Sequence, residues 1–262
     1  MGLRRFYLLP EQKNQPESFL EGDEARHILK VLRLGAGDPV VLFDGTGWEG
    51  LARIARVEGG KIYLSIREQR FLPKDSLLKI RLAVPLIRPQ PLEWILQKGT
   101  ELGVFAFIPY YSTYSGPKAF RQDGGEKRSR WERIIAAAGK QCGRNRLPIL
   151  ENPVSLDRVL ESEGTGLRII PYEEETAYTF RNLADNTPKV EEVLACIGPE
   201  GGFSPDEIKQ AREKKFLPLS LGPRVLRSET AALALVTLLQ FTWGDLSEPY
   251  PTGRNWADIH EE

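Results

Sequence analysis

The feature that most constrains the fold is a strand–loop–helix pattern that occurs twice in succession between residues 195 and 239. In each copy an apolar run leads into a glycine–proline turn, and a helix start follows. The two turns are GPEGG at residues 198–202 and GPR at residues 222–224. Loops of this kind, close in sequence, can lie side by side, so we expect them to build one pocket from main-chain groups.

The period of the apolar residues changes once along the chain. Residues 1–72 contain short apolar runs separated by Asp-Gly and Gly-Gly turns, which predicts a meander of short strands and a small β-barrel, interrupted by one helix at 21–34. From residue 78 onward strands alternate with helices, which predicts an α/β domain with a parallel sheet. The barrel strands are expected at 40–43, 48–57 and 61–66; the sheet strands at 78–84, 104–109, 167–170, 195–197 and 216–221; and the later helices at 91–102, 127–142, 205–215 and 228–242. We therefore expect domains at 1–72 and 73–243, with an irregular tail at 244–262.

Composition and rare residues exclude several classes of protein. The chain is 41% hydrophobic and 27% charged with zero formal net charge, and its longest apolar run, at 231–243, is too short to span a bilayer. We therefore expect a soluble, cytoplasmic protein without a membrane partner. Cys142 and Cys196 have no neighbouring ligands, so no metal site is expected. With only His27 and His260 and no Gly-x-Ser-x-Gly turn, histidine-based hydrolysis is not expected either.

The first turn does not favour phosphate binding. It lacks the Gly-Lys-Ser/Thr ending of a P-loop and the Gly-x-Gly-x-x-Gly dinucleotide pattern, and it contains Glu200. A neutral or cationic small molecule is a better guest, because glycine lets the main chain approach a planar ring. A structural interpretation stays open beside it: Ser204 before Pro205 predicts a helix N-cap, and Ser228 is expected to cap the last helix.

Two groups of basic residues suggest a polyanionic partner. Residues 118–146 contain nine basic and three acidic side chains, although the whole chain is neutral. Within the helix at 21–34, Arg26, Lys30 and Arg33 mark one face, and with Arg4 and Arg5 they could meet a phosphate backbone. The alternative is an ordinary solvated helix face.

Three long motifs occur in order along the chain: QCGRN at 141–145, IGPEGGFS at 197–204 and LGPRVLRSETA at 221–231. Shorter stretches accompany them, RRFY at 4–7, HILKVLR at 27–33 and QKGTELGV at 97–104. Together they resemble the uridine-N3 methyltransferases of small-subunit ribosomal RNA, the methyltransferase E family of the SPOUT superfamily. That family typically has Thr where Ser228 stands.

The resemblance implies a fold and an activity. The fold would be a SPOUT-type parallel sheet with a deep trefoil knot, preceded by a PUA-like β-barrel; a knot is a rare exception among protein chains. The activity would be methylation of N3 of a specific uridine in small-subunit ribosomal RNA, assembled with its proteins, by a homodimer that uses S-adenosyl-L-methionine. Two alternatives remain open: a SPOUT methyltransferase with a different RNA target, and a non-catalytic RNA-binding module.

The resemblance also implies site residues. The cofactor-binding residues would be Pro171, Tyr172, Ile197, Gly198, Glu200, Gly201, Leu221, Gly222, Val225, Leu226 and Arg227. We expect Arg224 or Arg227 to stabilise a uracil anion, and Glu200 to order its loop and assist removal of the N3 proton. The RNA-binding residues would be Arg4, Arg5, Arg26, Lys30, Arg33, Arg144, Asn145 and Arg146.

Overall fold

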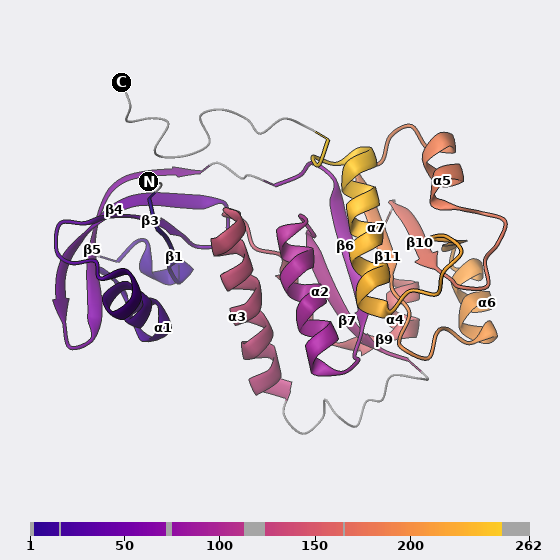
Figure 1. Cartoon of the computed structure of the whole chain (residues 1–262), viewed down its shortest axis with the longest axis horizontal. Coiled ribbons are helices and arrows are strands. Elements are labelled where there is room, and N and C mark those ends of the chain that lie inside the picture. The colour runs from indigo at the N-terminus through magenta and orange to yellow at the C-terminus, as the bar shows by residue number, and fades with distance from the viewer. Residues whose placement is uncertain (1–2, 16, 72–74, 113–123, 165, 248–262) are drawn as a thin grey trace. The chain divides into compact units, whose positions relative to one another are not determined.

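The computed structural model describes residues 3–15, 17–71, 75–112, 124–164 and 166–247 (Figure 1). Its described residues form two compact units, and each is considered by itself. Within the described ranges, the first unit lies in residues 3–75 and 139–147, and the second lies in residues 76–138 and 148–247.

A five-stranded sheet in the order β1-β3-β4-β5-β2 forms the first unit. Its strands are β1 Arg5–Tyr7, β2 Ser18–Leu20, β3 Pro39–Phe43, β4 Trp48–Glu58 and β5 Lys61–Phe71. Strands β3, β4 and β5 pair antiparallel, which confirms the predicted meander. The short strands β1 and β2 were not predicted; β1 pairs parallel with β3, and β2 pairs antiparallel with β5.

The predicted helix at 21–34 is present in an altered form. It begins as α1 Gly22–Arg26 and continues as a π-helical segment, His27–Leu32. Arg33 then ends it in the left-handed region, with a φ of 57°. The buried side chains of Ala25 and Ile28 pack into the core of the first unit with Phe6, Leu42 and Ile54.

The segment Gly139–Leu147 completes the first unit from far along the chain. The N–H of Gly47 donates to the carbonyl of Asn145 (2.9 Å), and the N–H of Leu147 donates to the carbonyl of Gly45 (2.9 Å). A Cβ on Gly139 would collide with the side chain of Leu147, which would then have to shift, so glycine favours this close packing. The first unit is therefore discontinuous in the sequence.

The sheet of the second unit is entirely parallel, as predicted. Its order is β12-β10-β11-β6-β7-β8, and β9 also pairs with β7. The strands are β6 Lys79–Pro85, β7 Ala106–Tyr111, β8 Ile149–Leu150, β9 Val154–Ser155, β10 Leu167–Pro171, β11 Glu192–Cys196 and β12 Leu217–Leu219. Crossovers of this kind place helices on both faces of a sheet.

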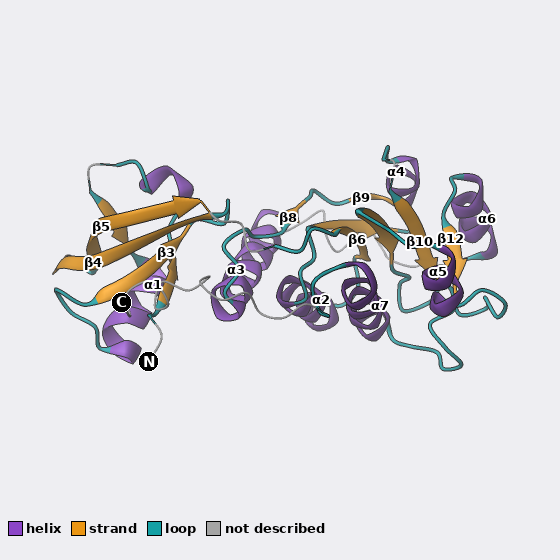
Figure 2. Cartoon of the chain, turned by 90° about the horizontal axis from the view of Figure 1, so that it is seen from above, coloured by secondary structure: helices purple, strands orange, loops and turns teal. Residues whose placement is uncertain are grey.

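Helices cover this sheet on both faces (Figure 2). They are α2 Pro89–Glu101, α3 Gly124–Cys142, α4 Leu156–Glu161, α5 Phe180–Asn186, α6 Pro205–Glu213 and α7 Ser228–Trp243. Helices α2 and α7 pack side by side on one face, where Gly99 of α2 lies against the ring of Phe107. On the other face α4 and α6 bury their apolar side chains against β6, β7, β10 and β11. The short helices α4 and α5 were not predicted.

Candidate functional site

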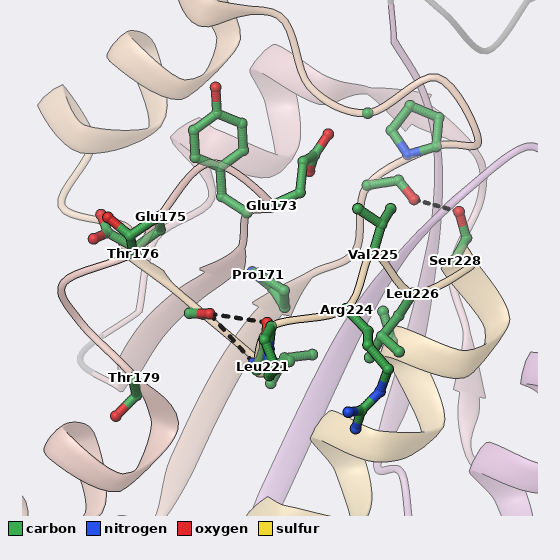
Figure 3. Close-up of a pocket in the computed structure, with 18 of the residues that line it drawn as sticks. Pro171, Glu173, Glu175, Thr176, Thr179, Leu221, Arg224, Val225, Leu226 and Ser228 are labelled. Atoms are coloured by element: carbon green, nitrogen blue, oxygen red, sulfur yellow. Dashed lines mark hydrogen bonds between the residues drawn. The ribbon is translucent and has the colours of Figure 1, made fainter.

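Three loops enclose a pocket of about 480 Å³ at the carboxyl ends of β10, β11 and β12 (Figure 3). Strand β10 lies between β11 and β12, and all three run parallel, so their following loops meet at one edge of the sheet. In open parallel sheets ligands bind at this edge. The prediction that both glycine–proline turns contribute to one pocket is confirmed, and the loop after β10 supplies a third wall.

The loop after β11 starts from a fixed point in the core. The N–H of Ile197 donates to the carbonyl of Ala83 (3.0 Å), and the hydroxyl of Tyr110 donates to the carbonyl of Ile197. Burial raises the pKa of the Tyr110 phenol well above its ordinary value, so the hydroxyl stays protonated and remains a donor. Both polar main-chain groups of Ile197 are thereby held where the GPEGG turn begins.

The end of the same turn is also ordered by hydrogen bonds. Gly202 has a φ of 74°, and its N–H donates to the carbonyl of Pro199 (3.0 Å). Ser204 then caps α6: its hydroxyl accepts from the N–H of Glu207 (3.2 Å), and the Glu207 carboxylate accepts from the N–H of Ser204 (2.8 Å). The N-cap predicted at Ser204, with Pro205 at the first helical position, is confirmed.

The expectation that Ser228 caps α7 is wrong. Arg227 occupies the N-cap position, and its side chain makes no capping bond. The hydroxyl of buried Ser228 instead donates to the carbonyl of Gly198 at 2.7 Å. This bond joins the start of α7 to the GPEGG turn, so Ser228 fixes one glycine–proline loop against the other.

The loop after β10 is bonded to the loop after β12 through the main chain. The N–H of Tyr172 donates to the carbonyl of Leu219 (3.0 Å), and the N–H of Ser220 donates to the carbonyl of Tyr178 (2.8 Å). The carboxylate of Glu175 accepts from the N–H groups of Ala177 and Tyr178, and these bonds hold the pKa of Glu175 below its ordinary value.

Most of the predicted cofactor residues line this pocket, and so does Arg224. Those that do are Pro171, Tyr172, Gly198, Glu200, Leu221, Gly222, Val225 and Leu226. Three others belong to the same loops but do not line it: Ile197 is buried at the end of β11, while Gly201 and Arg227 are exposed. Their predicted contact with a cofactor stays a prediction.

Sequence reasoning missed further lining residues. These are Glu173, Glu175, Thr176, Thr179, Pro199, Gly202, Ser220, Pro223, Ser228 and Ala231. All are close neighbours of predicted residues in the sequence. A signal for the first three was present in the polar run EEET at 173–176, because it directly follows a predicted strand.

The charges of the pocket are mainly acidic. Among its described lining residues are the carboxylates of Glu173, Glu175 and Glu200, and a single guanidinium, that of Arg224. The Glu200 carboxylate pairs with Arg88, whose Nε lies 2.9 Å from Oε1. A wall of main chain and small side chains with acidic groups suits a small neutral or cationic molecule better than a phosphate.

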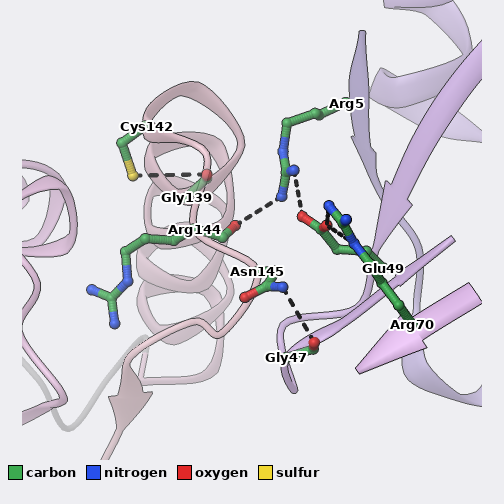
Figure 4. Close-up of polar contacts among 8 residues, drawn as sticks. All are labelled: Arg5, Gly47, Glu49, Arg70, Gly139, Cys142, Arg144 and Asn145. Carbon is green, nitrogen blue, oxygen red and sulfur yellow. Dashed lines mark hydrogen bonds and ion pairs between the residues drawn. The ribbon is translucent and has the colours of Figure 1, made fainter. Parts of the chain in front are cut away.

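The basic residues predicted to bind RNA differ in exposure. Arg4, Arg26, Lys30 and Arg33 are exposed, although Arg26 pairs with Asp23. Arg5 is largely internal: its Nη1 lies 2.5 Å from Oε1 of Glu49, and its Nη2 donates to the carbonyl of Arg144 at 3.3 Å (Figure 4).

The QCGRN motif also turns its side chains inward. Arg144 is 8% exposed, and its Nη2 lies 2.9 Å from Oδ1 of Asp75. Asn145 is fully buried, and its amide donates to the carbonyl of Gly47 at 3.2 Å (Figure 4). Arg146 is partly exposed and also faces Asp75. Direct RNA contact by these residues stays a prediction. To contact RNA, the side chains of Arg144 and Asn145 would have to break their bonds to Asp75 and to the carbonyl of Gly47.

Some of the basic side chains at 118–146 form contacts with other groups of the protein. Arg128 of α3 donates to the carbonyl of Leu150 at 2.8 Å, and Nε of Arg130 lies 2.7 Å from Oε1 of Glu93. Two of the basic residues, Lys118 and Arg121, and one of the acidic residues, Asp123, lie outside the described residues.

Three further features concern metal ligands, membrane helices and thiol reactivity. Within the described ranges no group of three or more His, Cys, Asp or Glu side chains is placed to hold a metal ion. No helix in those ranges has both the length and the apolar character needed to cross a bilayer. Burial raises the pKa of the Cys196 thiol to about 12, which makes it a poor nucleophile.

Two family models match the chain. A model described as an RNA methyltransferase PUA domain matches residues 20–67, within the first unit. A model described as an RNA methyltransferase domain matches residues 74–240, which is more than half of the chain. The second match includes all three loops of the pocket.

Curated relatives extend over nearly the same length. The ribosomal RNA small subunit methyltransferase E of Bacillus subtilis is 30% identical over 245 residues, which cover 91% of this chain and 96% of the relative. The protein of the same name from Buchnera aphidicola subsp. Schizaphis graminum is 32% identical over 225 residues, covering 84% and 89%.

Solved structures are similar over both units. A methyltransferase-like protein from Legionella pneumophila, in complex with bound SAM, has a TM-score of 0.85 and 36% identity, covering 94% of this chain and 100% of that one. The ribosomal RNA small subunit methyltransferase E of Neisseria gonorrhoeae, bound to S-adenosyl methionine, has a TM-score of 0.81 and 29% identity, covering 93% and 99%.

Proposed function

Since the chain belongs to the ribosomal RNA small subunit methyltransferase E family, we propose that it transfers a methyl group from S-adenosyl-L-methionine to N3 of a uridine in small-subunit ribosomal RNA. The observation that carries this proposal is the pocket that both glycine–proline turns line at the ends of β10, β11 and β12. The similar proteins from Legionella pneumophila and Neisseria gonorrhoeae were solved with this cofactor bound, which supports it.

The residues of the pocket fit S-adenosyl-L-methionine. Its volume of about 480 Å³ lies within the usual range for small-ligand sites. Gly222 has a φ of 117° and open space where a Cβ would stand, and a Cβ on Gly198 would come within 3.0 Å of the Phe203 ring. Gly198 and Gly222 line the pocket without side chains, so main-chain groups contribute to its wall beside the side chains of Leu221, Val225 and Leu226. Main-chain groups can bond an adenine ring. The bound cofactor supplies an electrophilic methyl carbon.

The reaction requires a proton to leave the uracil. N3 forms its bond to the methyl carbon as the carbon–sulfur bond breaks, and the N3 proton passes to a base. We assign Arg224 or Arg227 to the negative charge that develops on the uracil, because a positioned cation stabilises such an anion. Glu200 orders its loop through the ion pair with Arg88 and assists removal of the proton.

The remaining parts of the proposal concern RNA and assembly. Exposed Arg4, Arg26, Lys30 and Arg33 are proposed to contact RNA phosphates, with Arg5, Arg144, Asn145 and Arg146 as further contacts once their present partners are released. We also propose a cytoplasmic homodimer and a knotted chain within residues 73–243, between a barrel at 1–72 and a tail at 244–262. The family resemblance supports these points.

The decisive experiment measures methyl transfer from labelled S-adenosyl-L-methionine to small-subunit RNA, either free or assembled with its proteins. Mass spectrometry of nuclease fragments then maps the modified nucleotide. We expect 3-methyluridine at one position. A methyl group on a different nucleotide would contradict the proposed substrate atom, and absence of cofactor binding in calorimetry would favour an RNA-binding module.

Replacing Arg224 or Arg227 by alanine is expected to slow methyl transfer by about a hundredfold, the usual loss when one donor to a developing anion is removed. The rate is measured in single turnover on the substrate found above. Lys209→Ala, which removes an exposed cation from α6, is the control and should keep the wild-type rate. Wild-type rates in both arginine variants would refute their assigned role.

Replacing Ser228 by alanine is expected to weaken cofactor binding about two- to tenfold, because the bond to the carbonyl of Gly198 is lost. Ser228→Thr keeps a hydroxyl and should bind like the wild type. Isothermal titration calorimetry with S-adenosyl-L-methionine measures both. Equal affinity of the alanine and threonine variants would mean that this bond does not shape the pocket.

A further inference from the structure

Glu173 differs from the other carboxylates around the pocket. Among the described residues it has no hydrogen-bond or ion-pair partner, although its side chain lines the pocket. Each of the others is engaged: Glu174 by the Tyr172 hydroxyl (2.7 Å), Glu175 by Arg212 (3.2 Å) and Glu200 by Arg88 (2.9 Å). Among the described carboxylates that line the pocket, Glu173 is therefore the one whose charge no paired cation offsets.

The carboxylate of Glu173 is placed at the junction of two loops. The residue belongs to the loop after β10, and its Oε1 reaches over Gly202 of the loop after β11, where a Cβ would collide with it. Figure 3 shows the side chain on the wall of the pocket, directed toward that second loop. Gly202 thus provides the space that this carboxylate occupies.

We infer that Glu173 makes the pocket favour the cationic cofactor over its neutral product, an inference that rests on the proposed function. S-adenosyl-L-methionine contains a sulfonium centre and has one net positive charge at neutral pH. S-adenosyl-L-homocysteine has lost that charge together with the methyl group. The two molecules share every other group, so only a charge on the protein can distinguish them at long range.

The preference for the cofactor over its product favours exchange of the two molecules after each reaction. Transfer of the methyl group removes the cationic centre, so attraction by Glu173 holds the substrate form and is lost when the product forms. The neutral product is therefore held less tightly than the cofactor, and a fresh cofactor molecule can replace it. Arg224 is the single guanidinium among the described lining residues, and its positive charge repels the cationic cofactor. The unpaired carboxylate of Glu173 counteracts this repulsion.

The effect is expected to be modest, because the Glu173 side chain is exposed and solvent screens its charge. Removing the charge by Glu173→Gln should lower the ratio of affinities, S-adenosyl-L-methionine over S-adenosyl-L-homocysteine, by about two- to fivefold at low salt. The change should shrink as salt is added, since screening weakens interactions between exposed charges.

The experiment titrates the full-length protein with each compound by calorimetry, in low and high salt. Glu173→Asp keeps the charge and should retain the wild-type ratio, whereas Glu173→Gln should lose part of it. Glu213→Gln removes an exposed carboxylate at the end of α6 that does not line the pocket, and it should leave the ratio unchanged. Sinefungin, which has an amine in place of the methyl-bearing sulfonium, should respond to the variants as S-adenosyl-L-methionine does.

The possible outcomes distinguish a failure of this inference from a failure of the proposed function. If Glu173→Gln weakens both compounds equally, the carboxylate accepts a bond from a shared group such as a ribose hydroxyl, and charge discrimination is overturned. An unchanged ratio in this variant overturns it as well. If the wild-type protein binds neither compound, the proposed function itself fails.

Discussion

Replacing Gly202 by valine is expected to weaken binding of S-adenosyl-L-methionine by about tenfold to a hundredfold. The φ of 74° at this position is strained for any residue with a Cβ and most of all for a β-branched one. Such strain costs about 1–3 kcal/mol, and the new side chain also displaces the Glu173 carboxylate. Calorimetry with the cofactor measures the loss directly.

Gly60 provides a matched control for this substitution. It has a φ of 77° in the turn between β4 and β5, with open space around it, in the first unit. Gly60→Val introduces the same kind of backbone strain away from the pocket, so thermal unfolding should detect it while cofactor affinity stays unchanged. Equal affinities of the Gly202 variant and the wild type would show that the turn does not need this conformation to bind.

Replacing Glu49 by alanine is expected to destabilise the protein by about 3–5 kcal/mol, the usual cost of removing one partner from a buried ion pair. Its carboxylate is fully buried between two guanidinium groups, 2.5 Å from Nη1 of Arg5 and 2.9 Å from Nη2 of Arg70. Both arginines are largely buried, so without Glu49 their charges lose compensation that water does not fully replace. Urea unfolding followed by circular dichroism measures the change.

The control for Glu49 is an exposed carboxylate of the same unit. Glu17 accepts two hydrogen bonds from Arg56 and is 59% exposed, so Glu17→Ala should leave the free energy of unfolding nearly unchanged. Similar losses in the two variants would mean that burial does not determine the contribution of Glu49.

Local patterns were sufficient to predict the antiparallel strands β3, β4 and β5. The Asp-Gly and Gly-Gly turns join strands that are adjacent in both sequence and space, so β3, β4 and β5 follow from their own residues. Strand β1 could not be predicted in this way. It has three residues, too few to show a period, and its parallel pairing with β3 depends on contacts far along the chain, such as Arg5 with Val41.

Predictions of the pocket succeeded for main-chain geometry and were less complete for side chains. Glycine–proline turns after apolar strands indicate where the backbone bends, and the structure places both turns together. A serine at a helix start predicts an N-cap. The sequence does not show whether its hydroxyl bonds its own helix or a neighbouring loop. Ser204 does the first and Ser228 does the second, and only the packing of α7 against Gly198 distinguishes them.

The basic motif at 141–145 shows a different limit. Arginine and asparagine on a glycine-containing loop suggest contact with RNA, yet the same donors also satisfy internal acceptors. Asp75 and the carbonyl of Gly47, which accept from Arg144 and Asn145, are about seventy and a hundred residues away. No pattern among neighbouring residues indicates that acceptors so far away in the sequence lie close in space.

The discontinuity of the first unit has a consequence for how the chain matures during translation. The amino-terminal sheet gains its last segment only when Gly139–Leu147 has left the ribosome, after β6, α2, β7 and most of α3 have already emerged. Until then Gly45 and Gly47 lack the main-chain partners that Leu147 and Asn145 provide. Domains usually fold as units in order of synthesis. Here the unit that is made first should finish after much of the second has appeared, and a nascent chain arrested before residue 139 should show weaker protease resistance in its amino-terminal sheet.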